Sequence, residues 1–92
     1  MATEHHIKSW PDYFWPIHDG VASFTLRRDD RRYAVGDVLV LMEFDSNKGG
    51  YTGRECRRRI RYKLQGGGIG SIAPLHGLAR EFCILGLDDG EA

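Results

Sequence analysis

Residues 20–37 read Gly-Val-Ala-Ser-Phe-Thr-Leu-Arg-Arg-Asp-Asp-Arg-Arg-Tyr-Ala-Val-Gly-Asp. From Ala22 onward apolar and polar side chains alternate, which is the period of a half-buried strand. Six consecutive charged residues, Arg27 to Arg32, follow, and a glycine turn at 36–37 then starts the most hydrophobic run of the chain. Because charge this dense between two apolar strands is unusual for ordinary surface, we interpret it as the rim of a site.

Two elements are predicted before this stretch. Residues 5–10 alternate as a short strand that stops at Pro11, because proline cannot donate to a strand ladder. Asp12 can cap one or two helical turns, which Asp19-Gly20 ends. The chain is therefore expected to begin with a strand and a short helix.

Several elements are predicted after it. Residues 38–44 are apolar on both faces until Glu43, as in a central strand covered on both sides. Residues 45–53 are rich in Gly, Asn and Ser and indicate a loop. The triple glycine that opens residues 66–77 indicates a flexible connection, and residues 81–87 predict a last apolar strand.

The strand predicted over residues 55–65 carries a stripe of positive charge. Alternation places this cationic stripe on one face: Arg57, Arg59, Arg61 and Lys63. The same alternation places the remaining side chains of the strand on the opposite face: Cys56, Arg58, Ile60, Tyr62 and Leu64. Four like charges on one face repel one another unless something negative lies across them. That partner is either the phosphate of a nucleic acid or Glu43 and Asp45 on an adjacent strand, and a charged edge strand is a third explanation.

Together these elements predict one α+β, β-rich domain over residues 1–92. The expected architecture is a small mixed β-barrel of five to six strands, with one short helix near the N-terminus and a polar tail over residues 89–92. Thirteen Lys and Arg balance thirteen Asp and Glu, so no net charge attracts nucleic acid or anionic membranes. Ten of the thirteen cations nevertheless fall within residues 27–32 and 54–63, so one face can still be basic.

The cysteines and histidines show no spacing typical of a metal site. Cys56 and Cys83 lie within apolar strand patterns, as reduced core thiols of cytosolic proteins do. No apolar run approaches the length of about 18 residues that a membrane span needs, and the N-terminus has no apolar signal region. We therefore expect a soluble cytoplasmic domain without a metal or cofactor.

Several blocks of sequence occur in an order that resembles a known family. The blocks are His5-His-Ile-Lys8, Pro11-Asp-Tyr-Phe14, Phe24-Thr-Leu-Arg27, Asp29-Asp-Arg31, Val35-Gly-Asp-Val-Leu39, Glu43-Phe-Asp45, Tyr51-Thr-Gly-Arg54, Ile60-Arg-Tyr62 and Ile84-Leu-Gly86. Together they are similar to small uncharacterised ASCH-like domains of the PUA superfamily. The resemblance implies a compact β-barrel, a cleft between the first helix and the neighbouring strands, and an association with RNA.

The broader ASCH pattern is Gly-x-Lys-x-x-Glu-x-Arg, whose Lys, Glu and Arg are thought to face the cleft. Here Gly20 and Arg27 match, whereas Ala22 and Thr25 stand at the Lys and Glu positions. Some relatives are described as amidohydrolases of modified nucleosides that use a lysine, a hydroxyl residue and a glutamate. Ala22 removes that lysine, while Ser23 matches the hydroxyl position.

Seven residues are the candidates for the cleft: His5, Lys8, Trp10, Ser23, Arg27, Asp30 and Arg31. The planar guanidinium of Arg27 can grip a phosphate or lie on a base, but it can also pair with Asp30 to close the rim. Lys8 can contact a phosphate or, if desolvated, act as a nucleophilic amine, and a solvated lysine is the alternative. Trp10 can stack on a base or cover the core.

These observations favour a non-catalytic RNA-binding module over an enzyme. In such a module the cleft holds a base, nucleotide or phosphate, and the cationic stripe follows the RNA backbone. The alternative is a small amidohydrolase acting on a modified nucleoside, with Lys8 as the amine, Ser23 as the hydroxyl, and Glu43 or Glu81 as general acid or base. A structural or protein-interaction domain is the third hypothesis, and the sequence does not give the oligomeric state.

Overall fold

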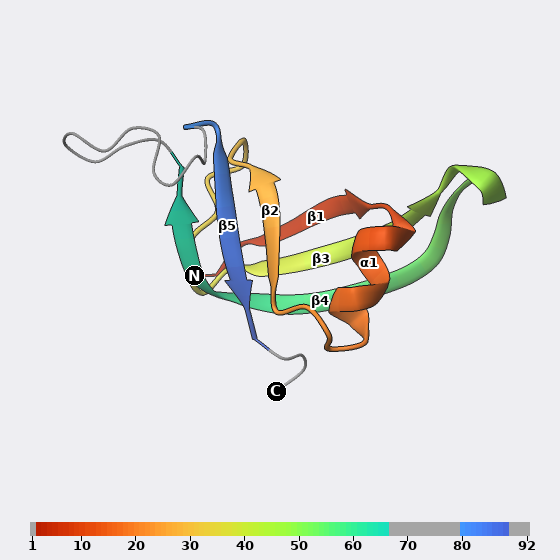
Figure 1. The fold of residues 1–92 in the computed structure, drawn as a ribbon, viewed down its shortest axis with the longest axis horizontal. Helices are drawn as coiled ribbons and strands as arrows, with labels where there is room; N and C mark the ends of the chain where they lie inside the picture. Colours follow the sequence, from red (N-terminus) through yellow and green to blue (C-terminus); the bar gives the residue numbers. More distant parts are fainter. Residues whose placement is uncertain (1, 67–79, 89–92) are drawn as a thin grey trace.

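The computed structural model describes residues 2–66 and 80–88. Its elements are β1 (Glu4–Ser9), α1 (Pro11–His18), β2 (Phe24–Arg28), β3 (Val38–Asp45), the 3₁₀ helix η1 (Ser46–Lys48), β4 (Gly50–Gln65) and β5 (Phe82–Leu87). The α+β class and the short helix near the N-terminus are confirmed (Figure 1). The predicted connection beyond Gly66 and the predicted tail over residues 89–92 lie outside the described residues. No helix in the described ranges is long and apolar enough to cross a membrane.

The strands form one five-stranded sheet in the order β1-β3-β4-β5-β2. β1 runs parallel to β3, and the other neighbouring pairs are antiparallel. The 16-residue strand β4 joins the two ends of the sheet, because its first part pairs with β3 and its last part with β5 (Figure 1). Leu39, Val40 and Leu41 of β3 are buried, which confirms the central strand predicted over residues 38–44.

The sheet is open and does not close into the predicted barrel. β1 and β2 stand at opposite ends of the strand order and are not paired with each other among the described residues. β2 has only five residues and pairs with β5. After β1 the chain turns into α1, which packs against β3 and β4. The helix therefore covers part of the sheet at β3 and β4.

A β-bulge in β4 changes which side chains share a face. The register with β5 shifts between Ile60 and Tyr62, so Arg61 is an extra residue in β4. Beyond the bulge the alternation is inverted: Tyr62 is exposed, and Lys63 is turned to the side of the buried Ile60. The prediction of one face for the whole cationic stripe is wrong, because it assumed uninterrupted alternation.

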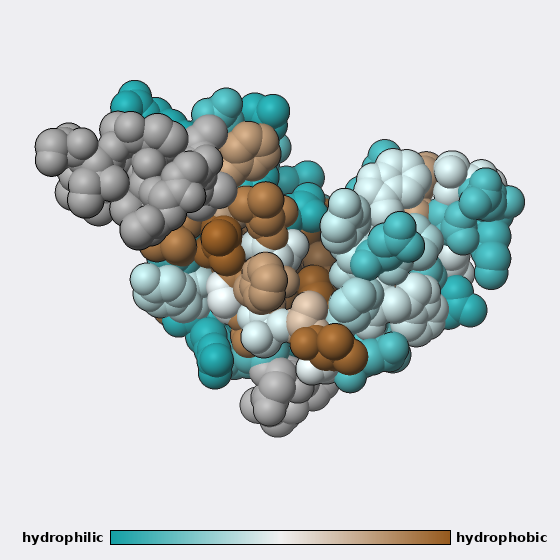
Figure 2. Space-filling view, in the orientation of Figure 1, coloured by the Kyte–Doolittle hydropathy of each residue, from teal (hydrophilic) through white to brown (hydrophobic). Residues whose placement is uncertain are grey.

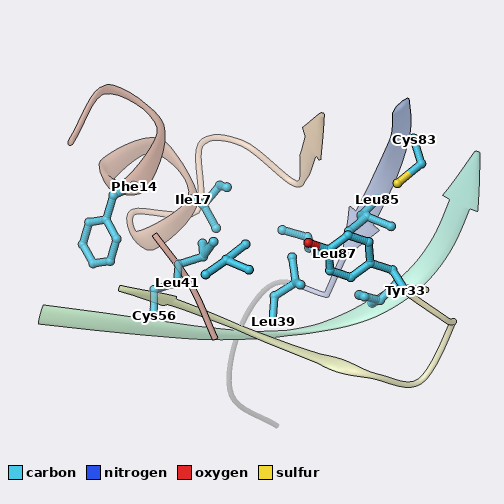
Figure 3. Close-up of a cluster of buried hydrophobic side chains, with 11 residues drawn as sticks. Phe14, Ile17, Tyr33, Leu39, Leu41, Cys56, Cys83, Leu85 and Leu87 are labelled. Carbon is cyan, nitrogen blue, oxygen red and sulfur yellow. The ribbon is translucent and has the colours of Figure 1, made fainter. Parts of the chain in front are cut away.

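The hydrophobic core extends from α1 across the sheet to β5 (Figure 3). Phe14 and Ile17 are the buried side chains of α1, and they join Leu41 of β3 and the buried leucines of β5 in one cluster. Cys56 and Cys83 are free and buried in this cluster, as predicted. Burial raises the pKa of both thiols, which makes them poor nucleophiles.

Two boundaries differ from the prediction. The helix begins at Pro11, and Trp10 is the N-cap residue without a side-chain hydrogen bond, so Asp12 lies in the first turn instead of capping it. The loop predicted over residues 45–53 is shortened by η1, which Gly49 caps with a left-handed φ of 88°, and by the start of β4.

β2 alternates as predicted, but its apolar side chains are the exposed ones. Phe24 and Leu26 are 58% and 56% exposed, whereas Thr25 and Arg27 are half-buried. The strand lies at one end of the sheet order, where no further strand covers it among the described residues. Both apolar side chains are therefore left exposed to solvent.

Candidate functional site

A cleft of about 740 Å³ opens between α1, the end of β1 and β2. Figure 2 shows the molecule hollowed on this face, with hydrophobic residues gathered over β5 and β2 beside the hollow. Three of the predicted cleft residues line it together: Lys8, Trp10 and Arg27. The structure therefore brings three of the predicted residues to one concave surface.

Lys8 is placed at the end of β1, above a group of aromatic rings. Its Nζ lies 4.4 Å from the ring centroid of Phe44 and 5.7 Å from that of Trp10. The two rings meet edge-on with their centroids 5.2 Å apart. The ring faces attract the ammonium group and limit its positions, which leaves its charge available at the cleft. No salt bridge of Lys8 occurs within the described ranges.

Arg27 projects from β2 on the other side of the cleft and is half-buried. The pair between Arg27 and Asp30, one of the predicted alternatives, is not found among the salt bridges of the described residues. The hydroxyl of Tyr33 is buried nearby and has no hydrogen-bond partner in the described part of the chain. Burial raises the pKa of this hydroxyl, and the charge of Arg27 opposes the rise.

Apolar and aromatic side chains complete the walls of the cleft. Trp10 is 45% exposed and Tyr13 is 68% exposed, although both carry large rings. Phe24 and Leu26 face them from β2. Exposed rings beside two cations are suited to a planar ligand that carries negative charge.

Comparison with known proteins places the chain in a family. Residues 4–87 match the model of a domain of unknown function, DUF3850. The chain belongs to this family. It is also similar to the uncharacterized 12.9 kDa protein in the GpA 3′ region of Escherichia phage P2, with 37% identity over 60 residues. The match covers 65% of this chain and 53% of the phage protein, so the chain spans about half the length of that relative.

Four other predicted residues of this DUF3850 domain lie outside the cleft lining, and one of them, His5, is buried and hydrogen-bonded to Asp37. The carbonyl of Ser23 accepts a hydrogen bond from the N–H of Leu87 at 2.8 Å, and the residue is exposed. Arg31 donates to the carbonyl of His6 at 3.0 Å. Asp30 is exposed in the segment after β2. The charged run of residues 27–32 therefore contributes Arg27 to the cleft, while its other residues lie elsewhere.

The two candidate glutamates also lie outside the cleft lining. Glu43 is buried and accepts hydrogen bonds from the Thr52 hydroxyl at 2.7 Å and from Arg54 at 3.1 Å. The Thr52 hydroxyl lowers the pKa of this carboxyl most, desolvation opposes it, and Arg54 lowers it further. Glu81 is exposed just before β5. The structure therefore does not bring Ser23, Glu43 or Glu81 together with Lys8 in this cleft.

Most of the cationic stripe is paired with acids that the sequence did not identify as partners. The pairs are Arg57 with Glu4, Arg59 with Asp88 at 3.8 Å, and Lys63 with Asp29 at 3.1 Å. Lys63 also donates to the carbonyl of Tyr33 at 2.9 Å. Arg61 forms no salt bridge with another described residue. Internal pairing, and not Glu43 with Asp45, therefore balances most of this charge.

Sequence reasoning missed Tyr13, Phe24 and Leu26 as cleft residues. Periodicity alone assigns the apolar side chains of an alternating strand to a core, and no signal in the sequence marked these residues as exposed. The described residues contain no group of three or more His, Cys, Asp or Glu side chains that could hold a metal ion.

Proposed function

We propose that this domain is a non-catalytic module that binds single-stranded RNA in the cleft between α1 and β2. The observation that carries the proposal is that two cations, Lys8 and Arg27, line the same cleft as several exposed aromatic rings. Neither cation has an acidic partner among the described residues. A phosphate supplies the missing charge, and a base covers the apolar wall.

Each group has a distinct task in this complex. The guanidinium of Arg27 binds a phosphate with two parallel hydrogen bonds, and the ammonium of Lys8 acts as a point charge on a neighbouring phosphate. A base stacks on Trp10 or Tyr13, which every base can do through its π face. The cationic stripe has no part in the complex, because most of its charge is already balanced within the protein.

The resemblance to ASCH-like domains of the PUA superfamily supports this assignment. Ala22, Thr25 and Arg27, at the three positions thought to face the cleft in that pattern, all line the cleft here. Gly20, the first position, has a left-handed φ of 81°, which favours glycine. Ala22 and Thr25 replace the lysine and glutamate of the pattern, so the cleft keeps the shape for a nucleotide without those two groups.

Titration of a fluorescently labelled single-stranded RNA at low and moderate salt tests the proposal. The wild-type protein should bind at low salt. Arg27→Gln and Lys8→Gln should each weaken binding about fivefold to tenfold, since each removes one charged contact. Arg59→Gln and Arg61→Gln remove the same charge outside the cleft and should leave the affinity within about twofold. Absence of binding at low salt, or an equal loss in the two control variants, would refute the proposal.

A further inference from the structure

The unpaired edge of β2 opens into the cleft. The N–H of Leu87 donates to the carbonyl of Ser23, and the N–H of Asp29 donates to the carbonyl of Glu81. These two pairs lie six residues apart in one antiparallel register, so Thr25 and Arg27 also turn their backbone groups toward β5. The residues between them, Phe24 and Leu26, turn their N–H and C=O groups the other way.

These backbone groups have no partner among residues 2–66 and 80–88. β2 is the last strand in the sheet order, and no backbone or side-chain hydrogen bond of the described chain uses the N–H or C=O of Phe24 or Leu26 on that edge. The other free edge differs, since Arg31 donates to the carbonyl of His6 on β1. At the next outward position of β2, the carbonyl of Arg28 accepts from the N–H of Asp30 at 2.9 Å. The carbonyls of Arg28 and His6 are thus hydrogen-bonded, whereas the outward backbone groups of Phe24 and Leu26 are not.

One strand residue offers a donor and an acceptor side by side. The Watson–Crick edge of every nucleobase carries the complement, an N–H or amino donor next to an acceptor nitrogen or oxygen. The rings of Trp10 and Tyr13 stand at the same cleft for stacking, and Lys8 and Arg27 supply positive charge for the phosphates. Groups that can bind the edge of a base, its face and its phosphate therefore surround this edge of β2.

We propose that the β2 edge hydrogen-bonds the Watson–Crick edge of an unpaired base through the backbone N–H and C=O of Phe24 or Leu26. This inference rests on the proposed RNA binding and adds how the base is read. Because the contacts come from the backbone, the domain recognises any base whose Watson–Crick edge is free. Paired bases and bases methylated on that edge are rejected.

A base fits this edge better than an added peptide strand does. Strand addition gains its affinity from a long ladder of main-chain hydrogen bonds. β2 is five residues long, and the Arg28 carbonyl is already occupied, which leaves two outward residues, Phe24 and Leu26, for such a ladder. Two residues are enough for one base and too few for a stable strand.

Two oligouridylates with one methyl group per base test the inference with identical mass and charge. In one, every base is 5-methyluracil, whose Watson–Crick edge is free. In the other, every base is N3-methyluracil, which has lost its N–H donor. The wild-type domain should bind the N3-methylated strand at least about tenfold more weakly, because a backbone carbonyl loses its partner and the methyl group obstructs the approach.

A proline substitution tests the protein side of the same contact. Leu26→Pro removes an N–H that does not serve the ladder with β5, and edge strands tolerate proline at such positions. Leu26→Ala is the matched control, since it removes the side chain and keeps the N–H. The proline variant should bind oligouridylate about tenfold more weakly than the alanine variant. Circular dichroism establishes that each variant is folded, and the methylated strands decide the question if the proline variant is not.

The possible outcomes separate this inference from the proposed function. Equal affinity for the two methylated strands would overturn reading by the β2 edge while leaving RNA binding intact. Absence of binding to every strand at low salt would overturn both proposals. Binding of an extended polyglutamate peptide without binding of RNA would overturn both in favour of strand addition.

Discussion

The imidazole of His5 and the carboxylate of Asp37 form a buried hydrogen bond, with Nε2 and Oδ2 2.8 Å apart. The same carboxylate accepts the backbone N–H of Thr3 at 3.1 Å and that of Ala34 at 3.2 Å. Asp37 therefore joins the start of β1 to the turn before β3. The bond from His5 is the main cause that lowers the pKa of Asp37 below its ordinary value of 3.8, and desolvation opposes it.

Asp37→Ala should lower the free energy of unfolding by about 2–3 kcal/mol, because three donors lose their acceptor in a buried site. The pKa of Asp37 is lower in the folded state, so its stabilisation is fully present above the ordinary pKa. It is lost as the pH falls through the folded pKa. Urea unfolding of the wild type and of Asp37→Asn, followed by circular dichroism from neutral to acid pH, should show their difference shrinking. Asp30→Asn, at an exposed aspartate whose carboxylate has no salt bridge among the described residues, should show little difference at any pH.

Glu43 and Arg54 should show a coupling energy that depends on pH. The carboxylate is buried, and its pKa is lowered first by the Thr52 hydroxyl and then by Arg54. Arg54→Gln leaves a buried charge with one partner fewer, so this variant should be less stable at neutral pH. In the Glu43→Gln background, Arg54→Gln should lower the free energy of unfolding by a smaller amount. A double-mutant cycle by urea unfolding should give a favourable coupling that weakens in acid, and a pH-independent coupling would contradict the ion pair.

Lys63 and Arg59 should differ in their effect on stability, although simple alternation places them on one face. Lys63 is 20% exposed and contacts both Asp29 and the carbonyl of Tyr33. Arg59 is 55% exposed, and its partner Asp88 lies 3.8 Å away. Lys63→Ala should cost about 1–3 kcal/mol and Arg59→Ala under about 1 kcal/mol in urea unfolding. Equal costs would mean that the bulge at Arg61 does not turn Lys63 inward.

The elements of this fold could be predicted because each one carries a local signal. The alternation in β2, the continuous apolar run of β3 and the helix after Pro11 are all read from neighbouring residues. The bulge at Arg61 has no such signal, since it depends on how β4 passes from one partner strand to another. The open sheet could not be predicted either, because it depends on contacts between segments that are distant in the sequence.

Part of the candidate site could be predicted from the sequence. The family resemblance implied the cleft and the place of Arg27 in it, residue chemistry added Lys8 and Trp10, and all three residues line one cleft. The exposure of Phe24 and Leu26 could not be predicted, because it depends on which strand lies outermost in the sheet. Ion pairs were missed for a similar reason: Arg57 and Glu4 are 53 residues apart in the chain.

The two cleft cations also predict how RNA binding responds to salt. Each phosphate contact on a single strand contributes about −0.7 to the slope of log K against log salt concentration. Contacts by Lys8 and Arg27 should therefore give a slope of about −1.4, and Lys8→Gln or Arg27→Gln should each reduce it to about −0.7. Arg61→Gln, which removes a cation outside the cleft, should leave the slope unchanged. A wild-type slope several times steeper would show that further cations bind the backbone, and the cationic stripe would have to exchange its internal partners for phosphate.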